Sequence, residues 1–155
     1  MALKKWDLRH LAIAQHVSCW SKDPSTKVGA VIADKRGNVV ALGFNGFPEN
    51  VQDAQHKLDD RPTKYEMTVH AEVNAVIIAG RSAEGGTIYV HGAPICPRCA
   101  GVLIQAGIAR AVAKTPRHNT GIKWDEDGLI ALDMFAEAKI DFDPIGDTDA
   151  REISK

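Results

Sequence analysis

The spacing of apolar residues along the chain first predicts an amphipathic helix. Between residues 4 and 20, apolar residues recur at steps of three and four, as expected for a helix that buries one side. The stripe consists of Trp6, Ile13, Val17 and Trp20. His10 falls on this stripe and is interpreted as a core or boundary histidine, whereas His16 lies off it and is expected to face solvent.

Strand-like and helix-like segments then alternate. Two β-branched runs, residues 28–33 and 39–44, flank a polar turn and predict a β-hairpin. We expect the remaining helices at 71–80, 96–107 and 124–139, and the remaining strands at 87–91, 109–114 and 140–142. The βαβ order implies parallel neighbours. The pattern therefore predicts a three-layer α/β/α fold around a central mixed five-stranded sheet, with residues 147–155 frayed.

The segment 47–67 is longer than a typical connection and contains Pro48 and Pro62. Long ordered loops in compact domains are often lids. We expect such a loop here, with His56 on its surface.

The composition indicates one domain spanning residues 1–155. With 45% hydrophobic and 25% charged residues, it is ordinary for a soluble globular protein. No apolar run is long enough to cross a bilayer and the N-terminus lacks a signal-like apolar core, so we expect a cytoplasmic protein without membrane contact. The net charge of −1 supplies no basic stripe for a nucleic acid, whereas a mononucleotide needs only one or two cations.

Four residues supply a candidate metal centre. His70 and Glu72 form a His-x-Glu motif, and Cys96 and Cys99 form a Cys-x-x-Cys motif. One imidazole and two thiolates are zinc ligands, and three protein ligands leave one coordination position open for catalysis. Glu72 then serves as the proton carrier for a zinc-activated water that attacks a ring carbon bearing an amino group.

The spacing also predicts how these ligands meet. If Pro97 is the first residue of a helix, Cys96 and Cys99 project to one side of its first turn. His70 would open the preceding helix. The positive ends of two helices would then favour ionised sulfur.

These motifs resemble those of zinc-dependent deaminases of the cytidine deaminase superfamily, most closely the deoxycytidylate (dCMP) deaminases of bacteria and phages. The similar segments are 28–32, 43–46, 70–75, 96–99 and 103–108. Two positions depart from the family pattern: Ile95 is inserted between Pro94 and Cys96, and Phe44 replaces a tyrosine. Neither change removes a ligand.

The resemblance implies a cytidine-deaminase-like fold that hydrolyses dCMP to dUMP and ammonia, supplying dUMP for dTTP synthesis. It implies one catalytic Zn²⁺ per subunit and a homo-hexamer that is activated by dCTP with Mg²⁺ and inhibited by dTTP. By the same resemblance, the allosteric residues would be Gly43, Phe44, Asn45, Gly46 and Arg81.

The resemblance also suggests substrate contacts. Asn45 is assigned to the deoxyribose hydroxyl, and the backbone N–H of Ala71 to the pyrimidine carbonyl. The donors of the segment 22–27 are either a solvated turn or a phosphate grip formed by Lys22, Ser25 and Lys27. Arg81 either meets a phosphate or a neighbouring subunit, or is a plain surface residue.

Three further residues receive no catalytic role. Cys19 is interpreted as a small buried apolar residue, His118 as a loop residue, and His91 as either pocket-lining or simply the end of a strand. Some relatives bind a second zinc after the Gly-Asn turn, but Glu49 and Asn50 stand there, so no second site is expected.

Two alternatives remain open. A sister deaminase could act on free cytosine, a nucleoside, dCTP, guanine or tRNA adenosine. A non-catalytic zinc-binding module would normally be closed by a fourth Cys or His, and it would leave Glu72 without a task.

Overall fold

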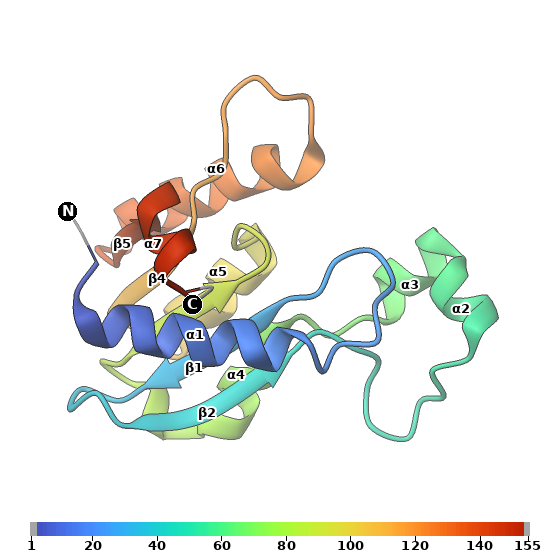
Figure 1. Cartoon of the computed structure of the whole chain (residues 1–155), viewed down its shortest axis with the longest axis horizontal. Coiled ribbons are helices and arrows are strands. Elements are labelled where there is room, and N and C mark those ends of the chain that lie inside the picture. The colour runs from blue at the N-terminus through green and yellow to red at the C-terminus, as the bar shows by residue number, and fades with distance from the viewer. Residues whose placement is uncertain (1–2, 154–155) are drawn as a thin grey trace.

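The computed structural model describes residues 3–153, which form a mixed five-stranded sheet between two layers of helices (Figure 1). The sheet order is β2-β1-β3-β4-β5. The strands are β1 (Gly29–Ala33), β2 (Val39–Phe44), β3 (Thr87–His91), β4 (Arg110–Lys114) and β5 (Asp141–Ile145). β1 pairs antiparallel with β2 and β3, whereas β3, β4 and β5 run parallel. The mixed sheet is as predicted.

The four predicted helices are present in the predicted order, and the structure adds α2, α3, α7 and one 3₁₀ turn. They are α1 (Lys5–Ser18), α2 (Gln55–Asp59), α3 (Arg61–Met67), α4 (Ala71–Ala79), the 3₁₀ turn η1 (Gly80–Ala83), α5 (Pro97–Gln105), α6 (Lys123–Glu137) and α7 (Asp147–Ile153). Hydrogen bonds and backbone conformation determine where some of these helices begin and end. Asp7 accepts a hydrogen bond from the Lys4 backbone N–H at the start of α1. Gly80 ends α4 with φ of +53°, a conformation that glycine adopts easily.

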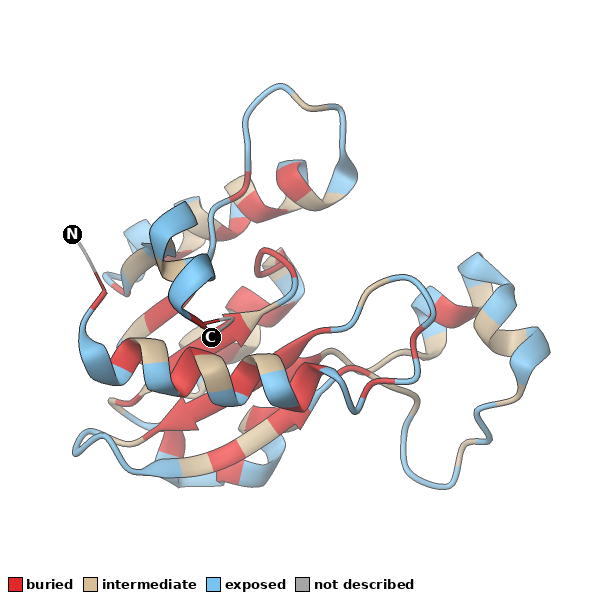
Figure 2. Cartoon of the chain, in the orientation of Figure 1, coloured by how far each residue is buried: buried red, intermediate tan, exposed pale blue. Residues whose placement is uncertain are grey.

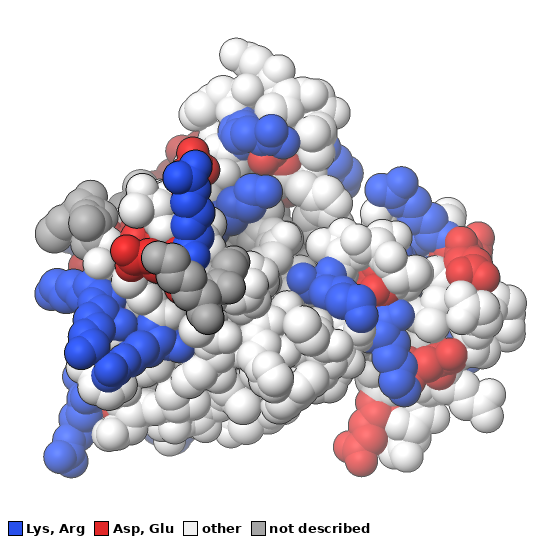
Figure 3. All heavy atoms as spheres, in the orientation of Figure 1, with Lys and Arg blue, Asp and Glu red and all other residues white. Residues whose placement is uncertain are grey.

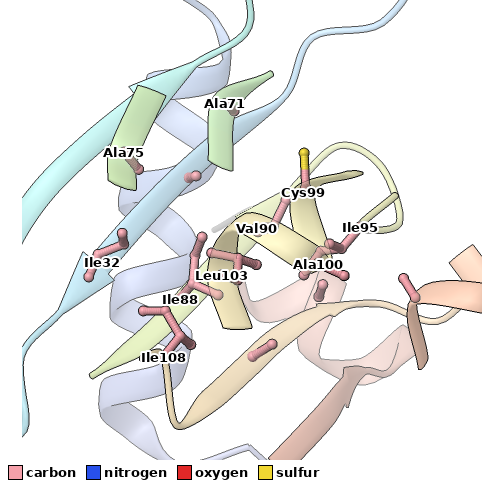
Figure 4. Packing of buried hydrophobic residues seen from close by; sticks show 14 of the residues in the cluster. Ile32, Ala71, Ala75, Ile88, Val90, Ile95, Cys99, Ala100, Leu103 and Ile108 are labelled. Carbon is pink, nitrogen blue, oxygen red and sulfur yellow. The ribbon is translucent and has the colours of Figure 1, made fainter. Parts of the chain in front are cut away.

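Alternating residues of the strands face two separate apolar clusters. Val31, Tyr89 and Val112 point to the layer formed by α1 and the end of α7. Ile32, Ile88 and their neighbours pack on the opposite face against α4, α5 and α6. Figure 4 shows this second cluster, with Ala71 and Ala75 of α4 on one side and Cys99, Ala100 and Leu103 of α5 on the other. The metal-ligand helices are therefore anchored directly on the sheet.

The predicted apolar stripe of α1 is wrong in its details. Trp6, Ile13 and Trp20 are exposed, while the buried side of the helix carries Asp7, His10, Leu11, Ala14, Val17 and Ser18. His10 is buried and His16 is exposed, as expected. Asp7 can lie on the buried face because Tyr89 and Arg110 donate hydrogen bonds to its carboxylate.

Two other predicted segments were also wrong. The segment 47–67 is not a continuous loop, because it contains α2 and α3, and both helices lie in a lobe beside the sheet (Figure 1). Asp60 caps α3 by accepting a hydrogen bond from the Thr63 backbone N–H. Residues 147–153 form α7 instead of fraying, and Ile153 packs under α1; residues 154 and 155 lie outside the described part.

The residues of the core and of the lobe formed by α2 and α3 differ in burial. Figure 2 shows that the central strands β1, β3 and β4 are largely buried, whereas the edge strands β2 and β5 and the helices α2 and α3 are mostly exposed or half-buried. On the face shown in Figure 3, Lys and Arg gather in separate groups divided by uncharged atoms.

Among residues 3–153, no helix combines the length and apolar character that crossing a bilayer requires.

Candidate active site

His70, Cys96 and Cys99 meet where two helices begin on the same face of the sheet. His70 is the N-cap residue of α4 and Cys96 is the N-cap residue of α5, with Pro97 at the first position of that helix. The Nδ1 atom of His70 lies 3.3 Å from Cys99 Sγ and 3.5 Å from Cys96 Sγ. The predicted convergence of these three side chains is confirmed.

The arrangement of the donors fits a tetrahedral zinc ion. All three donor atoms lie within 4.8 Å of one another. Zinc bonds of about 2.3 Å to sulfur and about 2.0 Å to nitrogen place the nitrogen and sulfur ligands of a tetrahedral site roughly 3.5 Å apart. The observed N···S distances match this value, and in the described chain this cluster offers three ligands rather than four. The donor set is therefore that of a zinc site with an open position.

The two thiols are electrostatically coupled. Hydrogen bonding from Cys99 and then from His70 lowers the pKa of Cys96 to about 4. The same contact with Cys96, together with burial, raises the pKa of Cys99, and hydrogen bonding to Cys96 raises the pKa of His70. The cluster thus favours a thiolate at Cys96, and a bound cation would favour ionisation of both sulfurs.

Glu72 lies beside the donor set in the first turn of α4. Its side chain is buried, and it lines the same cavity as the three metal ligands. Burial raises the pKa of this carboxyl above its ordinary value, and this outweighs the opposing effect of His70. Burial thus favours the protonated form of this carboxyl, which suits a group that takes up a proton and passes it on.

The segment that joins β2 to the site holds α4 in place. A Cβ atom at Gly43 would collide with the backbone carbonyl of Ala71, so only glycine allows α4 to lie this close to β2. Asn74 donates to the Phe44 carbonyl over 2.8 Å. Gly46 forms an isolated antiparallel bridge with Val69, directly before His70. These contacts fix the position from which the imidazole is presented.

A cavity of about 770 Å³ opens above the metal ligands and Glu72. It extends between α3, the start of α5 and the start of α6. Tyr65 of α3 and Trp124 of α6 meet edge to face across it, with ring centroids 6.2 Å apart, and Trp124 also lies 6.2 Å from the His70 ring. Four cations line the cavity, namely Arg61, Lys64, Arg98 and Lys123. The cavity thus combines aromatic and cationic surfaces above the metal donors.

Of the predicted substrate residues, Asn45 and Ala71 line the cavity. The Asn45 carboxamide also holds the backbone, because Oδ1 accepts from the Val28 N–H over 2.8 Å and Nδ2 donates to the Thr26 carbonyl over 2.9 Å. Each group keeps one further hydrogen-bonding position. The assignment of Asn45 to a sugar hydroxyl stays a prediction.

The structure does not bring the other predicted residues to the cavity lining. Lys22 pairs with Asp53 over 2.7 Å, Lys27 donates to the Ser21 carbonyl, and Ser25 contacts Lys64. Arg81 is exposed in η1 beyond the end of α4. Of the two interpretations left open for His91, the end of a strand is the one observed, since it closes β3 and does not line the cavity.

Two minor predictions have opposite outcomes. Cys19 is exposed at the end of α1, so its predicted burial was wrong; its Sγ contacts the Gln15 carbonyl at 3.7 Å. His56 is exposed on α2, as expected.

Sequence reasoning missed most of the outer cavity wall. Part of this wall is α3, in the segment 47–67 that was predicted as a loop; it supplies Arg61, Lys64 and Tyr65. The cysteine motif supplies Arg98, and the start of α6 supplies Lys123 and Trp124. Arg98 was the residue with an available signal, because it stands between the two cysteine ligands. The others depend on how distant helices fold over the site, which no local pattern encodes.

The donor set defines a zinc-binding protein with an open coordination position. A model of the cytidine and deoxycytidylate deaminase zinc-binding region matches residues 4–115, and the chain therefore belongs to this family of deaminases. An uncharacterised deaminase from the luxG 3′ region of Aliivibrio fischeri is 41% identical over 139 residues, covering 90% of this chain and 92% of that protein. Mouse deoxycytidylate deaminase is 34% identical over 124 residues, covering 74% of this chain and 67% of the mouse protein.

Solved structures share the fold. The dCMP deaminase of cyanophage S-TIM5, in complex with dCMP and dUMP, superimposes with a TM-score of 0.71 at 18% identity, covering 93% of this chain and 99% of that one. The three-layer cytidine-deaminase-like architecture expected from the motifs is confirmed.

Proposed function

We propose that this protein hydrolyses dCMP to dUMP and ammonia, supplying dUMP for dTTP synthesis. The observation that carries the proposal is the single cavity in which the His70, Cys96 and Cys99 donors and Glu72 lie beneath aromatic and cationic walls. The metal donors and Glu72 suit the reacting ring carbon of a pyrimidine nucleotide, the aromatic walls suit its base, and the cationic walls suit its phosphate. The mouse relative named deoxycytidylate deaminase and the cyanophage dCMP deaminase that shares the fold support the choice of substrate.

The protein's own groups divide the reaction between them. Bound zinc would supply the Lewis acid that makes a water reactive towards the ring carbon bearing the amino group. Glu72 takes the proton from that water and delivers protons to the ring nitrogen and to the departing ammonia. Its buried position keeps the carboxyl within reach of both partners and excludes bulk water from the proton transfers.

The cavity walls orient the nucleotide. Trp124 and Tyr65 offer flat apolar faces for the base, and stacking of a base on an aromatic side chain is worth about 1–3 kcal/mol. The Ala71 backbone N–H at the start of α4 is the proposed donor to the pyrimidine carbonyl. Asn45, at the cavity edge of β2, is the proposed contact to the deoxyribose hydroxyl.

The substrate test measures ammonia release by the zinc-loaded enzyme. The substrates are dCMP, deoxycytidine, cytosine, dCTP, guanine and a tRNA adenosine stem-loop, each compared by kcat/KM. We expect dCMP to be preferred. Higher kcat/KM with any of the other five would reject the proposal, while equal inertness towards all of them with zinc bound would favour a non-catalytic zinc module.

We also propose the family's regulation, namely a homo-hexamer activated by dCTP with Mg²⁺ and inhibited by dTTP. Asn45 faces the cavity while its neighbour Phe44 is exposed and contacts the exposed Trp20 ring, with centroids 5.9 Å apart. The segment 43–46 thus links the substrate cavity to an apolar outer surface on which a neighbouring subunit could act. Arg81 is proposed to take part from the end of α4.

Two measurements separate these regulatory proposals. Titrating dCTP with Mg²⁺ and dTTP during turnover should raise and lower the rate, respectively, and flat rates would remove the allosteric proposal while leaving the enzyme. Sedimentation velocity should give the mass of six chains. Location in the cytoplasm stays a prediction.

A further inference from the structure

The four cations that line the cavity are not equivalent, because two of them are already paired. Lys64 lies 3.0 Å from Asp23 Oδ1, and Lys123 lies 2.9 Å from Asp127. A lysine that is held by a carboxylate has little net charge to offer an anion. The remaining positive charge on the cavity wall therefore comes from the other two cations.

Arg61 and Arg98 have no carboxylate partner within the range 3–153. Arg61 begins α3, where its Nε donates to the Tyr65 hydroxyl over 2.7 Å, so its two terminal amino groups stay available. Arg98 lies in the first turn of α5, between the two cysteine ligands, and its side chain is exposed in the cavity wall. Two guanidinium groups from different helices thus face one cavity.

The remaining unpaired acid of the outer wall is Glu66. It lies five residues after Arg61 in α3, and at 3.6 residues per turn the two side chains leave the helix roughly 140° apart. Glu66 therefore does not share the direction of the Arg61 guanidinium. Within residues 3–153, no acid of the cavity wall is therefore paired with either arginine.

We infer that Arg61 and Arg98 bind the phosphate of the nucleotide and so select a phosphomonoester over a nucleoside. The inference rests on the proposed function and replaces Lys22, Ser25 and Lys27 as the phosphate grip. A phosphomonoester carries close to two negative charges at neutral pH, which two unpaired guanidinium groups match. Arginine also presents parallel N–H donors that fit phosphate oxygens, which a lysine cannot do.

The test compares dCMP with deoxycytidine in Arg61→Gln, Arg98→Gln and the double variant. Each single change should lower kcat/KM for dCMP about 10- to 100-fold, because charge-assisted hydrogen bonds are lost. The loss should appear mainly in KM, and turnover of deoxycytidine should change less than twofold. Arg36→Gln, in the exposed turn between β1 and β2, is the matched control and should behave as the wild type.

Binding provides a second measurement that does not depend on turnover. Calorimetric titration of the zinc-loaded variants with dUMP and deoxyuridine should show weaker dUMP binding and unchanged deoxyuridine binding. Zinc content and the thermal midpoint confirm that each variant is folded, and Arg98→Lys should recover only part of the dUMP affinity if the guanidinium fork matters.

The outcomes distinguish this inference from the proposed function. If dCMP is preferred but both arginine variants keep the wild-type ratio of dCMP to deoxycytidine, the inference is overturned alone. If Lys22→Gln or Lys27→Gln removes the preference instead, the phosphate lies at the segment 22–27 and the inference is again overturned. If the wild type prefers a phosphate-free substrate, both statements fail.

Discussion

Lys64 of α3 and Asp23 of the segment after α1 form an ion pair with an N···O distance of 3.0 Å, and both side chains are almost fully buried. The Lys64 ammonium also donates to Ser25 Oγ, and Asp23 accepts from the backbone N–H groups of Ser25 and Thr26. The pair fastens the lobe that carries Arg61 and Tyr65 to the body of the protein. It thereby defines one side of the substrate cavity.

We expect breaking this pair to be costly. Removing one partner of a buried pair leaves an uncompensated charge and typically costs about 3–5 kcal/mol. Lys64→Met should therefore lower the free energy of unfolding by that order and raise KM, because the α3 wall is released. Urea denaturation and steady-state kinetics measure the two effects.

The double variant Lys64→Met with Asp23→Asn tests the pairing itself. If the residues interact, its destabilisation should be smaller than the sum of the two single changes. Additive losses would mean that each residue acts independently. Lys57→Met on α2, at a half-buried lysine of the same lobe for which no ion pair is found among the described residues, serves as the control and should change the stability little.

Zinc content should depend on two cysteines and not on the third. Cys96→Ser and Cys99→Ser each remove a thiolate, so the purified variants should hold much less than one zinc per chain and lose activity. Cys19→Ser changes an exposed thiol away from the donor set and should keep wild-type zinc content. Metal analysis by mass spectrometry gives the result directly, and full zinc occupancy in Cys99→Ser would contradict the proposed ligand set.

Zinc binding should also stabilise the fold, because His70, Cys96 and Cys99 tie the starts of α4 and α5 together. Treatment with a chelator should lower the thermal midpoint, and added Zn²⁺ should restore it. The midpoint of Cys96→Ser should respond to neither addition. A chelator-sensitive midpoint in that variant would place the responsible metal elsewhere.

The metal centre was predictable because its geometry is local. His70 and Glu72 are two residues apart in sequence, and Cys96 and Cys99 are three residues apart. Pro97 marks the start of the helix that carries Cys99. The cavity wall was not predictable in this way. Lys64 and Asp23 are 41 positions apart in sequence. They meet only because α3 packs against the segment after α1, and no local sequence pattern predicts that packing.

The polar buried face of α1 escaped prediction for a related reason. Asp7 is charged, so periodicity alone places it on the solvent side and Trp6 in the core, yet the structure shows the reverse. Its burial is possible because Arg110 and Tyr89, which lie on β4 and β3, satisfy its carboxylate. Apolar periodicity treats each residue separately, so it does not detect partners that lie 82 and 103 positions away in the sequence.

Glu72→Gln should separate chemistry from metal binding. The amide keeps the size of the side chain but cannot carry the proton, so kcat should fall about 10²- to 10⁴-fold or more. Zinc content should stay at the wild-type level because Glu72 is not part of the donor cluster. Glu137→Gln, at the exposed end of α6, is the control for the loss of one carboxylate. Full turnover by zinc-loaded Glu72→Gln would refute the proposed proton carrier.

The buried carboxylate of Asp7 should make the stability of the protein sensitive to acid. Asp7 accepts hydrogen bonds from Tyr89 over 2.9 Å and from Arg110 over 2.7 Å. Burial alone would raise the pKa of Asp7, but Arg110, the Lys4 backbone N–H and Tyr89 lower it from 3.8 to about 2. A folded-state pKa below the unfolded one means that ionised Asp7 favours the folded protein.

The sign of this effect fixes the pH window. The contribution of Asp7 is fully present above its unfolded pKa of 3.8 and is lost as the pH falls through the folded value of about 2. The difference between the two values corresponds to about 2 kcal/mol. Asp7→Asn should therefore be clearly less stable than the wild type at pH 7, and the gap should narrow by about that amount between pH 5 and pH 2. Urea denaturation at each pH measures the gap, with the exposed Asp133→Asn as the control. A gap that stays constant down to pH 2 would show that the Asp7 carboxylate is not the group that titrates.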